Sequence, residues 1–162
     1  MKKLLSLIIV IGVIAGIFGI VNLTTPKIWE KNESNLKQLL IKEADGALNL
    51  ENYTPFRWDK IYIFKPHTAN QTIYKTVGYE WGKIKDNDNA SSMQVVFMKD
   101  NEVVCYSHGE AVKNGYYITT RFAENEQYVV ANSAELRLVF LSQEQGYALL
   151  DFKRASMYTT ID

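Results

Sequence analysis

The chain has 162 residues, of which 47% are hydrophobic and 12% aromatic, and its formal net charge is zero. This is enough apolar material for one packed domain plus an appendage, so the composition excludes a wholly disordered chain. When Lys2 and Lys3 are set aside, the 18 basic side chains fall to 16, against 18 acidic ones. A body with this balance has no excess of basic residues, which argues against nucleic acid as a partner.

The N-terminus carries the longest apolar run. Residues 4–23 read "LLSLIIVIGVIAGIFGIVNL", in which only Ser6 and Asn22 are polar. Twenty helical residues span about 30 Å, the thickness of the hydrocarbon core of a bilayer. We therefore expect a signal anchor over residues 1–25, with residues 4–23 in lipid, and a separate domain over residues 26–162. Lys2 and Lys3 favour a cytoplasmic N-terminus and a domain outside the cytoplasm.

Two other interpretations of this run stay open. A cleaved signal peptide would release a secreted domain, but its apolar region is usually only 7 to 15 residues long and ends at an Ala-x-Ala-like site. Leu23, Thr24 and Thr25 make a poor cleavage site of that kind. A buried helix of a soluble core is the third interpretation.

An amphipathic helix is expected after Pro26. Apolar residues recur at spacings of three and four from Leu36 to Leu48, which predicts one buried helical stripe. Asn32 or Ser34 is a suitable N-cap, and Pro55 closes the segment. We expect this helix to pack on the domain, with a helical stalk as the alternative.

The stretch "FRWDKIYIFKPHT", residues 56–68, lies next between two prolines. Ten residues between Pro55 and Pro66 favour a strand over a helix. Alternation places Trp58, Tyr62 and Phe64 on one face and Ile61 and Ile63 on the other. Because both faces are apolar in the middle, the pattern predicts an interior strand covered on both sides.

A second helix and a polar connection follow. Thr68 is a suitable N-cap for a helix that includes Ile73, Tyr74 and Val77, and Gly78 can end it. The segment "YEWGKIKDNDNASS" then reads as a loop that begins with aromatic residues.

From Met93 onward the chain reads as strands. Asp100-Asn101 predicts one hairpin turn, and Asn114-Gly115 predicts a second, of type I′. Gly109 is expected to mark a bulge. Three further strands, "EQYVVA", "ELRLVFL" and "YALLDFK", complete an antiparallel meander with turns near residues 132–133 and 143–146. The predicted class is α+β: an N-terminal transmembrane helix, then two helices on one curved, mainly antiparallel sheet of about six or seven strands.

The sequence lacks the motifs of catalysis and metal binding. Cys105, the only cysteine, lies in "VVCYS" and reads as a small buried hydrophobic residue. Neither His67 nor His108 has a second ligand at metal spacing, and "DNDN" at residues 86–89 fails the calcium-loop template. Ser107 and His108 are adjacent in a strand, so they point to opposite faces. We expect no cofactor, no metal and no enzymatic activity, although a pair of carboxylates that meets only in the fold stays open.

Aromatic and charged residues are the remaining candidates for binding. Tyrosine and tryptophan are enriched at interfaces because they bury area while keeping a polar group. Charged neighbours can fix the register of a partner. The candidate binding residues are Arg57, Trp58, Asp59, Lys60, Tyr62 and Trp81.

The segments "WDKIYIFKPHT", "VGYEW" and "VVFMKDNEVV" resemble small bacterial extracytoplasmic proteins that have a membrane or lipid anchor and a motif of the type WDKxYxFxPxT. The resemblance covers roughly residues 56 to 105 and implies an anchored extracytoplasmic domain. It transfers no active site, and His67 stands where the motif has tyrosine.

The sequence thus predicts a single-pass, membrane-anchored protein that displays a protein-binding domain outside the cytoplasm. By analogy with anchored proteins of similar size, an immunity-like role against a toxin is one form of this function. The alternatives are an envelope enzyme with an unrecognised acid/base pair and an accessory subunit of a membrane complex.

Overall fold

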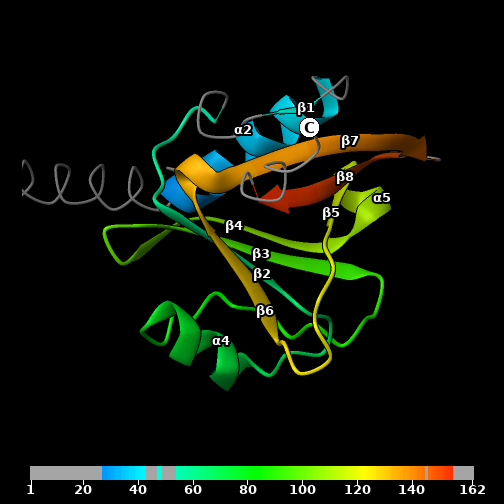
Figure 1. The fold of residues 1–162 in the computed structure, drawn as a ribbon. Coiled ribbons are helices and arrows are strands. Elements are labelled where there is room, and N and C mark those ends of the chain that lie inside the picture. Colours follow the sequence, from blue (N-terminus) through cyan, green and yellow to red (C-terminus); the bar gives the residue numbers. More distant parts are fainter. Residues whose placement is uncertain (1–26, 43–46, 49–53, 145, 155–162) are drawn as a thin grey trace, which may run out of the picture.

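The computed structural model describes residues 27–42, 47–48, 54–144 and 146–154 (Figure 1). The expected anchor, residues 4–23, lies outside the described residues. None of the helices in the described ranges has the length and apolar character needed to cross a bilayer. The elements in chain order are α2 (Ile28–Lys42), β1 (Ala47–Leu48), β2 (Lys60–Phe64), α4 (Asn70–Val77), β3 (Ser92–Lys99), β4 (Glu102–Glu110), α5 (Ala111–Asn114), β5 (Tyr116–Thr119), β6 (Tyr128–Asn132), the 3₁₀ helix η1 (Ser133–Glu135), β7 (Leu136–Glu144) and β8 (Tyr147–Arg154).

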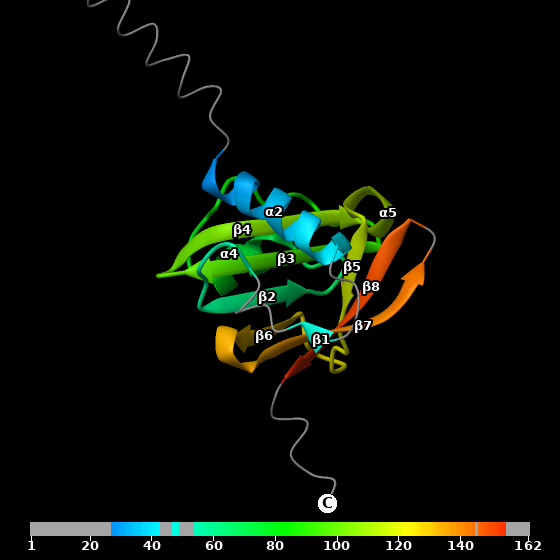
Figure 2. The same cartoon turned by 90° about the horizontal axis from the view of Figure 1, so that it is seen from above.

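The fold is α+β, as the sequence predicts, but its strands form two sheets instead of one curved sheet. Sheet I has the order β4-β3-β2-β6, and sheet II has the order β1-β7-β8-β5. Figure 1 shows α4 under sheet I, with α2 and sheet II over its other face. Viewed from above, α2 lies along β4, while β7 and β8 lie at the end of sheet I where α5 is found (Figure 2).

The strand β2 is an interior strand, as predicted. It pairs antiparallel with β3 on one side and with β6 on the other. Ile61 and Ile63 face the core between the sheets, and Phe64 faces the opposite cluster. The order is therefore not a meander, because β6 skips its sequence neighbours to pair with β2.

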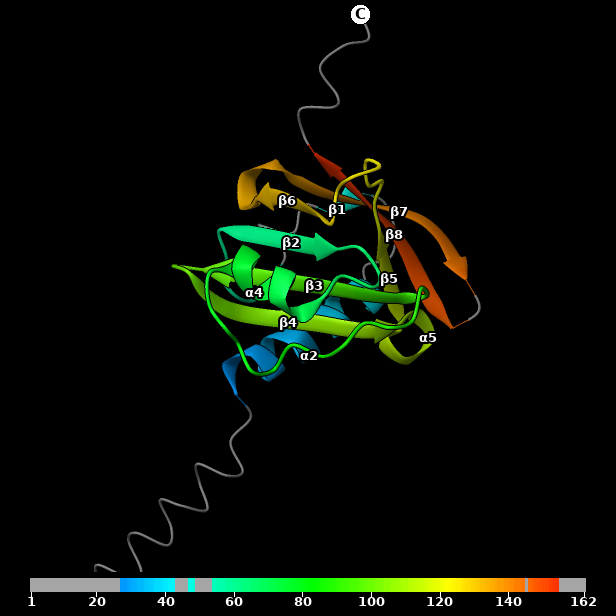
Figure 3. The same ribbon diagram turned by 90° about the horizontal axis from the view of Figure 1, so that it is seen from below.

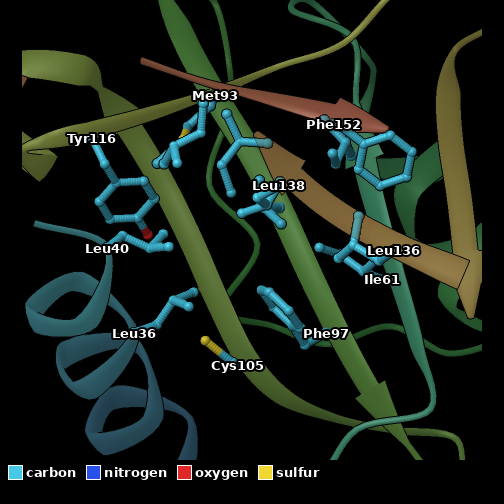
Figure 4. Close-up of a cluster of buried hydrophobic side chains, with 14 of the residues drawn as sticks. Leu36, Leu40, Ile61, Met93, Phe97, Cys105, Tyr116, Leu136, Leu138 and Phe152 are labelled. Atoms are coloured by element: carbon cyan, nitrogen blue, oxygen red, sulfur yellow. The ribbon is translucent and has the colours of Figure 1, made fainter. Parts of the chain in front are cut away.

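The main core fills the space between sheet I, sheet II and α2 (Figure 4). Leu36 and Leu40 of α2 reach it and are fully buried. From sheet II, Leu136 and Leu138 point inward, in agreement with the predicted face of that strand. Cys105 is also fully buried there, which confirms its expected role as a small core residue.

A second, smaller core lies on the other face of sheet I. It contains Ile73 and Val77 of α4 together with Phe64 and Val96. Figure 3 shows α4 lying across this face. Gly78 ends α4 in the left-handed conformation, φ 95°, as predicted. Thr68 was expected to cap α4, but its hydroxyl donates to the Lys65 carbonyl at 2.6 Å and also lies 3.2 Å from the Gln127 carbonyl oxygen.

The first helix begins earlier than the sequence predicted. The Lys27 carbonyl accepts the N–H of Glu30 and of Lys31, while the Glu30 carboxylate accepts the Lys27 N–H at 2.9 Å. This is one half of a capping box with Lys27 at the N-cap, so neither Asn32 nor Ser34 caps the helix. The stripe predicted to end at Leu48 also breaks, because Ala47–Leu48 forms β1 and pairs with β7.

The Asn114-Gly115 hairpin prediction was wrong. Residues Ala111–Asn114 form the short helix α5, and Gly115 is its left-handed C-cap, with φ 77° and its N–H bonded to the Ala111 carbonyl. The chain therefore leaves sheet I, and β5 pairs parallel with β8. Both a hairpin turn and a helix C-cap need positive φ, so the same two residues suit either.

The Asp100-Asn101 turn agrees with the prediction, but the bulge lies at a different residue from the predicted Gly109. Asp100 and Asn101 have φ of 50° and 65° and join β3 to β4. Gly109 pairs with Met93 in regular register, whereas the irregularity lies at Val104. The Asn32 side-chain amide donates to the Val104 carbonyl at 2.8 Å, so α2 satisfies a group that the bulge releases from the ladder.

Two leucines of β7 offer a matched test of the two-sheet core. Leu138 is fully buried and Leu141 is 50% exposed. We expect Leu138→Ala to lower the free energy of unfolding by about 2–5 kcal/mol, because it leaves a cavity between the sheets. Leu141→Ala should change it by less than about 1 kcal/mol. Urea denaturation of the two purified variants measures the difference, and equal losses would contradict this placement of β7.

Candidate functional site

The six residues predicted for binding do not lie together. Arg57, Trp58, Asp59 and Lys60 precede or begin β2. Tyr62 lies on the α4 face, where its ring contacts Phe64 and Tyr128. Trp81 lies in the loop after α4, against Trp29 and Tyr106. The structure thus divides the set among three places, and two of these places are hollowed.

Trp58 is a core residue at the edge of the first of these places. Its side chain is only 6% exposed, and its ring meets Phe97 edge-on with 5.3 Å between the centroids. The indole N–H donates to the Thr54 hydroxyl at 3.0 Å. Because the ring and its polar atom both have partners inside the fold, Trp58 supports the surface without offering its ring to a ligand.

Asp59 holds the neighbouring turn. Its carboxylate accepts the Asp100 N–H at 3.0 Å and lies 3.5 Å from the Lys99 ammonium. The side chain therefore ties the approach to β2 to the β3–β4 hairpin. Lys60, by contrast, is exposed.

Two hollows adjoin at Phe56 and Arg57. One hollow of about 680 Å³ is lined by Thr54, Pro55, Phe56, Arg57, Trp58 and Lys99. A second, of about 340 Å³, is lined by Ile28, Lys31, Asn32, Asn35, Pro55, Phe56, Arg57 and Val104. The two share Pro55, Phe56 and Arg57, so we treat them as one surface, the Phe56 groove.

The Phe56 groove is apolar at its base and basic at its rim. Phe56 is half-buried and packs edge-on against Phe97 with 5.6 Å between the centroids, and Ile28 is 62% exposed. Within the described residues, Lys31 and Arg57 make no ion pair. A shallow surface that combines apolar side chains such as Phe56 and Ile28 with polar groups and free positive charges suits an extended segment of a protein better than a small molecule.

A separate hollow, the Trp29 cleft, is lined by a different set of α2 residues from those that line the Phe56 groove. It measures about 250 Å³ and is lined by Trp29, Glu30, Glu33, Lys83, Lys85, Tyr106 and His108. The Trp81 ring packs nearly perpendicular to two lining rings, with centroid distances of 5.2 Å to Trp29 and 5.3 Å to Tyr106. The His108 ring is stacked beside Tyr106 at 6.0 Å.

Hydrogen bonds fix the polar groups behind the Trp29 cleft. The Tyr106 hydroxyl accepts the Lys85 N–H at 3.0 Å and the Gln94 side-chain amide at 2.9 Å. His108 Nε2 lies 3.1 Å from the Asp86 carbonyl oxygen, which can only accept, so Nε2 carries the hydrogen. Burial lowers the pKa of His108, and nearby Lys85 acts in the same direction. The ring is therefore neutral at pH 7, and its Nδ1 is an acceptor.

Glu33 contributes a carboxylate to the cleft, within reach of the positive charges of Lys37 and Lys85. Its carboxylate is half-buried and has no hydrogen bond or ion pair within the described residues. Burial raises the pKa of Glu33, although Lys37 and Lys85 act against the rise. A carboxylate held in this way lowers the stability of the folded chain at neutral pH, which is common where a charge serves binding.

Ser107 and His108, which are adjacent in β4, are not placed as a nucleophile and its base in the part of the chain that the structure describes. Ser107 is buried and shares a 2.5 Å hydrogen bond with the Tyr116 hydroxyl, on the face opposite His108. Across the described ranges, no cluster of three or more His, Cys, Asp or Glu side chains is placed to hold a metal ion. His108 and Glu33 line one cleft, but within the described residues the hydrogen bond of His108 goes to the Asp86 carbonyl and not to Glu33.

Of the residues in and around the Trp29 cleft, the sequence proposed only Trp81 for binding, while His108 was considered for metal binding and catalysis. Trp29 and Glu33 come from α2, whereas Tyr106 and His108 come from β4. The period-two spacing of Tyr106 and His108 was a signal that they share a face. Their meeting with Trp29, more than seventy residues earlier, had no local signal.

No family model, curated protein or solved structure matches the chain. The Phe56 groove and the Trp29 cleft are therefore interpreted from their own residues and geometry.

Arg57 and Trp58 are neighbours in the sequence, but only Trp58 is expected to contribute to the stability of the fold. Trp58→Ala should lower the free energy of unfolding by roughly 3–5 kcal/mol, because the ring is buried and its N–H is bonded. Arg57→Ala should change it by no more than about 0.5 kcal/mol, since the side chain is exposed. Thermal and urea unfolding of both variants check the contrast. A Trp58→Ala chain as stable as the parent would show that the ring is not in the core.

Glu33 predicts an unusual dependence of stability on pH. Because the folded chain holds this proton more tightly than the unfolded one, stability falls as the pH rises above 4.5 through the raised pKa. Glu33→Gln removes this loss, so it should raise the melting temperature at pH 7. The gain should disappear below pH 4.5. Glu124→Gln, in an exposed loop, is the control and should show no such gain; a gain in both variants would contradict the assignment.

Proposed function

We propose that the chain is a single-pass, membrane-anchored protein that displays a protein-binding domain outside the cytoplasm. The anchor in this proposal is residues 4–23, whose twenty positions include only Ser6 and Asn22 as polar residues. Lys2 and Lys3 support a cytoplasmic N-terminus. A secreted form, produced by cleavage of the same segment, is the alternative localisation.

The observation that carries this proposal is the Phe56 groove. Its two hollows adjoin along Pro55, Phe56 and Arg57, which gives a longer surface than a small ligand needs. The exposed Ile28 side chain adds apolar surface at one end. Such a surface can accept an extended loop or a terminus of another protein.

The charges at the rim indicate the chemistry of the partner. Lys31 and Arg57 are free of ion pairs within the described part of the chain, whereas Lys99 is shared with Asp59 and Asp100. A partner segment with an apolar side chain over Phe56 and acidic side chains on either side complements this rim. Arginine contributes most, because its planar group can bind a carboxylate through two hydrogen bonds.

The position of the groove in the chain also sets how far from the bilayer a partner can bind. Ile28 lines the groove and is five residues beyond Leu23, the end of the apolar run. Five residues span at most about 18 Å. With residues 4–23 in lipid, the partner therefore binds close to the bilayer surface. This suits an immunity-like role, in which an incoming toxin is intercepted at the membrane.

Two other functions remain as alternatives. An envelope enzyme would need a coupled acid/base pair, and the Trp29 cleft, with His108 and Glu33 in its lining, is where such a pair would be sought. An accessory subunit would bind its complex through the anchor helix. Replacing residues 4–23 by an unrelated apolar helix would abolish that activity, but it would leave groove binding intact.

Site-specific crosslinking tests the groove as the site of the partner. A photoreactive amino acid at position 57 of the full chain, in intact cells, should give one crosslinked protein of fixed mass. The same amino acid in place of Lys75, which is exposed on α4, should give none. External protease must first degrade the domain in intact cells, which establishes that it faces outward.

Charge reversal provides the matched affinity test. Arg57→Glu should weaken co-purification of the crosslinked partner by about tenfold or more, because it places like charges together. Lys75→Glu makes the same change on α4 and should leave it unaltered. Equal effects of both variants, or equal crosslinking from positions 57 and 75, would count against the groove.

A further inference from the structure

We infer that the Trp29 cleft binds a small organic ammonium compound that also carries an acidic group. The cleft lies apart from the Phe56 groove, and the two share no lining residue. The inference therefore stands whether or not the groove binds a protein.

The aromatic walls of the cleft suit a weakly hydrated cation. Trp29, Tyr106 and His108 line it, and the perpendicular packing of Trp81 against the first two holds their rings in place. An organic ammonium ion is attracted to the faces of aromatic rings, and tryptophan attracts it most strongly. A fixed arrangement of rings loses little conformational entropy when the ion enters.

Glu33 provides the matching negative charge. Its carboxylate lines the same cleft, is half-buried and lacks a recorded partner among the described residues. A ligand cation beside it would compensate the charge that burial now leaves unfavourable. Glu30 lines the cleft as well, but its carboxylate already accepts the Lys27 N–H, so Glu33 is the main anchor.

The neutral imidazole supports the same chemistry. His108 Nε2 is bonded to the Asp86 carbonyl, which leaves Nδ1 as an acceptor. A protonated histidine here would repel an ammonium ion, whereas a neutral ring adds aromatic surface. Because Glu30 and Glu33 line the cleft together with Lys83 and Lys85, a ligand that is only an anion would leave the two carboxylates without a cation.

The lysines at the cleft account for the second group of the ligand. Lys83 and Lys85 line the cleft, are exposed, and make no ion pair in the described part of the chain. A phosphate or carboxylate joined to the ammonium group can reach them while the cation stays against the rings. The volume of about 250 Å³ is below the range of drug-sized sites, so the compound is small.

Phosphocholine, choline, inorganic phosphate and 3,3-dimethylbutanol form a suitable set of probes. The first carries both charges, the second only the cation and the third only the anion. The fourth has the shape of choline without its charge. The full chain, in a maltoside detergent that lacks choline, is titrated with each probe while saturation-transfer NMR measures binding.

Phosphocholine should bind with a Kd of about 1 mM or below, and choline more weakly. Phosphate and 3,3-dimethylbutanol should show no binding in the same range. Binding of 3,3-dimethylbutanol as strong as that of choline would overturn the inference, since it would make the cleft merely apolar. Binding of phosphate without choline, or of no probe at all, would also overturn it.

Two variants tie the binding to the cleft. Trp29→Leu and Glu33→Gln should each weaken phosphocholine binding by about tenfold or more. Glu33→Gln is the sharper of the two, because it should fold at least as stably as the parent chain. Glu124→Gln is the matched control and should bind as the parent does. Unchanged binding in Glu33→Gln would overturn the inference.

A competition experiment distinguishes the two sources of such a group. Phosphatidylcholine added to the micelles should displace free phosphocholine if the natural ligand is a lipid headgroup at the membrane surface. Phosphocholine binding that persists under these conditions assigns the cleft to a free compound. Either result supports the site and identifies which form of the ligand reaches it.

Discussion

The fold depends on the burial of β3 on both faces. Seven consecutive residues of this strand, from Ser92 to Met98, are buried. Met93, Val95 and Phe97 face the core shared with sheet II and α2, while Val96 and Met98 face α4. A strand covered in this way cannot be exposed on either side without loss of apolar burial, so both cores must form together.

Helix α2 closes the open edge of sheet I and, in doing so, separates two surfaces. Leu36 and Leu40 bury its inner face, and Asn32 bonds the bulged carbonyl of Val104. On one side of the helix lies the Phe56 groove, and on the other the Trp29 cleft. Edge strands are sites of unwanted pairing unless they are covered. The residues that protect this edge therefore also shape both candidate sites.

Several features could be predicted from local sequence because local chemistry decides them. Positive φ at Asp100 and Asn101 makes a tight hairpin, and the apolar faces of β2, β7 and β8 follow from alternation. Asn114-Gly115 failed as a hairpin because the same backbone conformation ends a short helix equally well. Trp58 fell on the opposite side from Tyr62 and Phe64 because regular pairing begins only at Lys60.

The sequence alone determined which segments carry buried faces, where most turns lie, and that residues 4–23 are apolar enough to span a bilayer. Only the tertiary structure decided that β6 pairs with β2, that β5 runs parallel to β8, and that Trp29 meets Tyr106 and His108. Periodicity fixes the face on which a side chain lies, because it depends on neighbouring dihedral angles. The choice of a distant partner depends on the burial that competing arrangements of the whole chain can reach, and no local pattern encodes it.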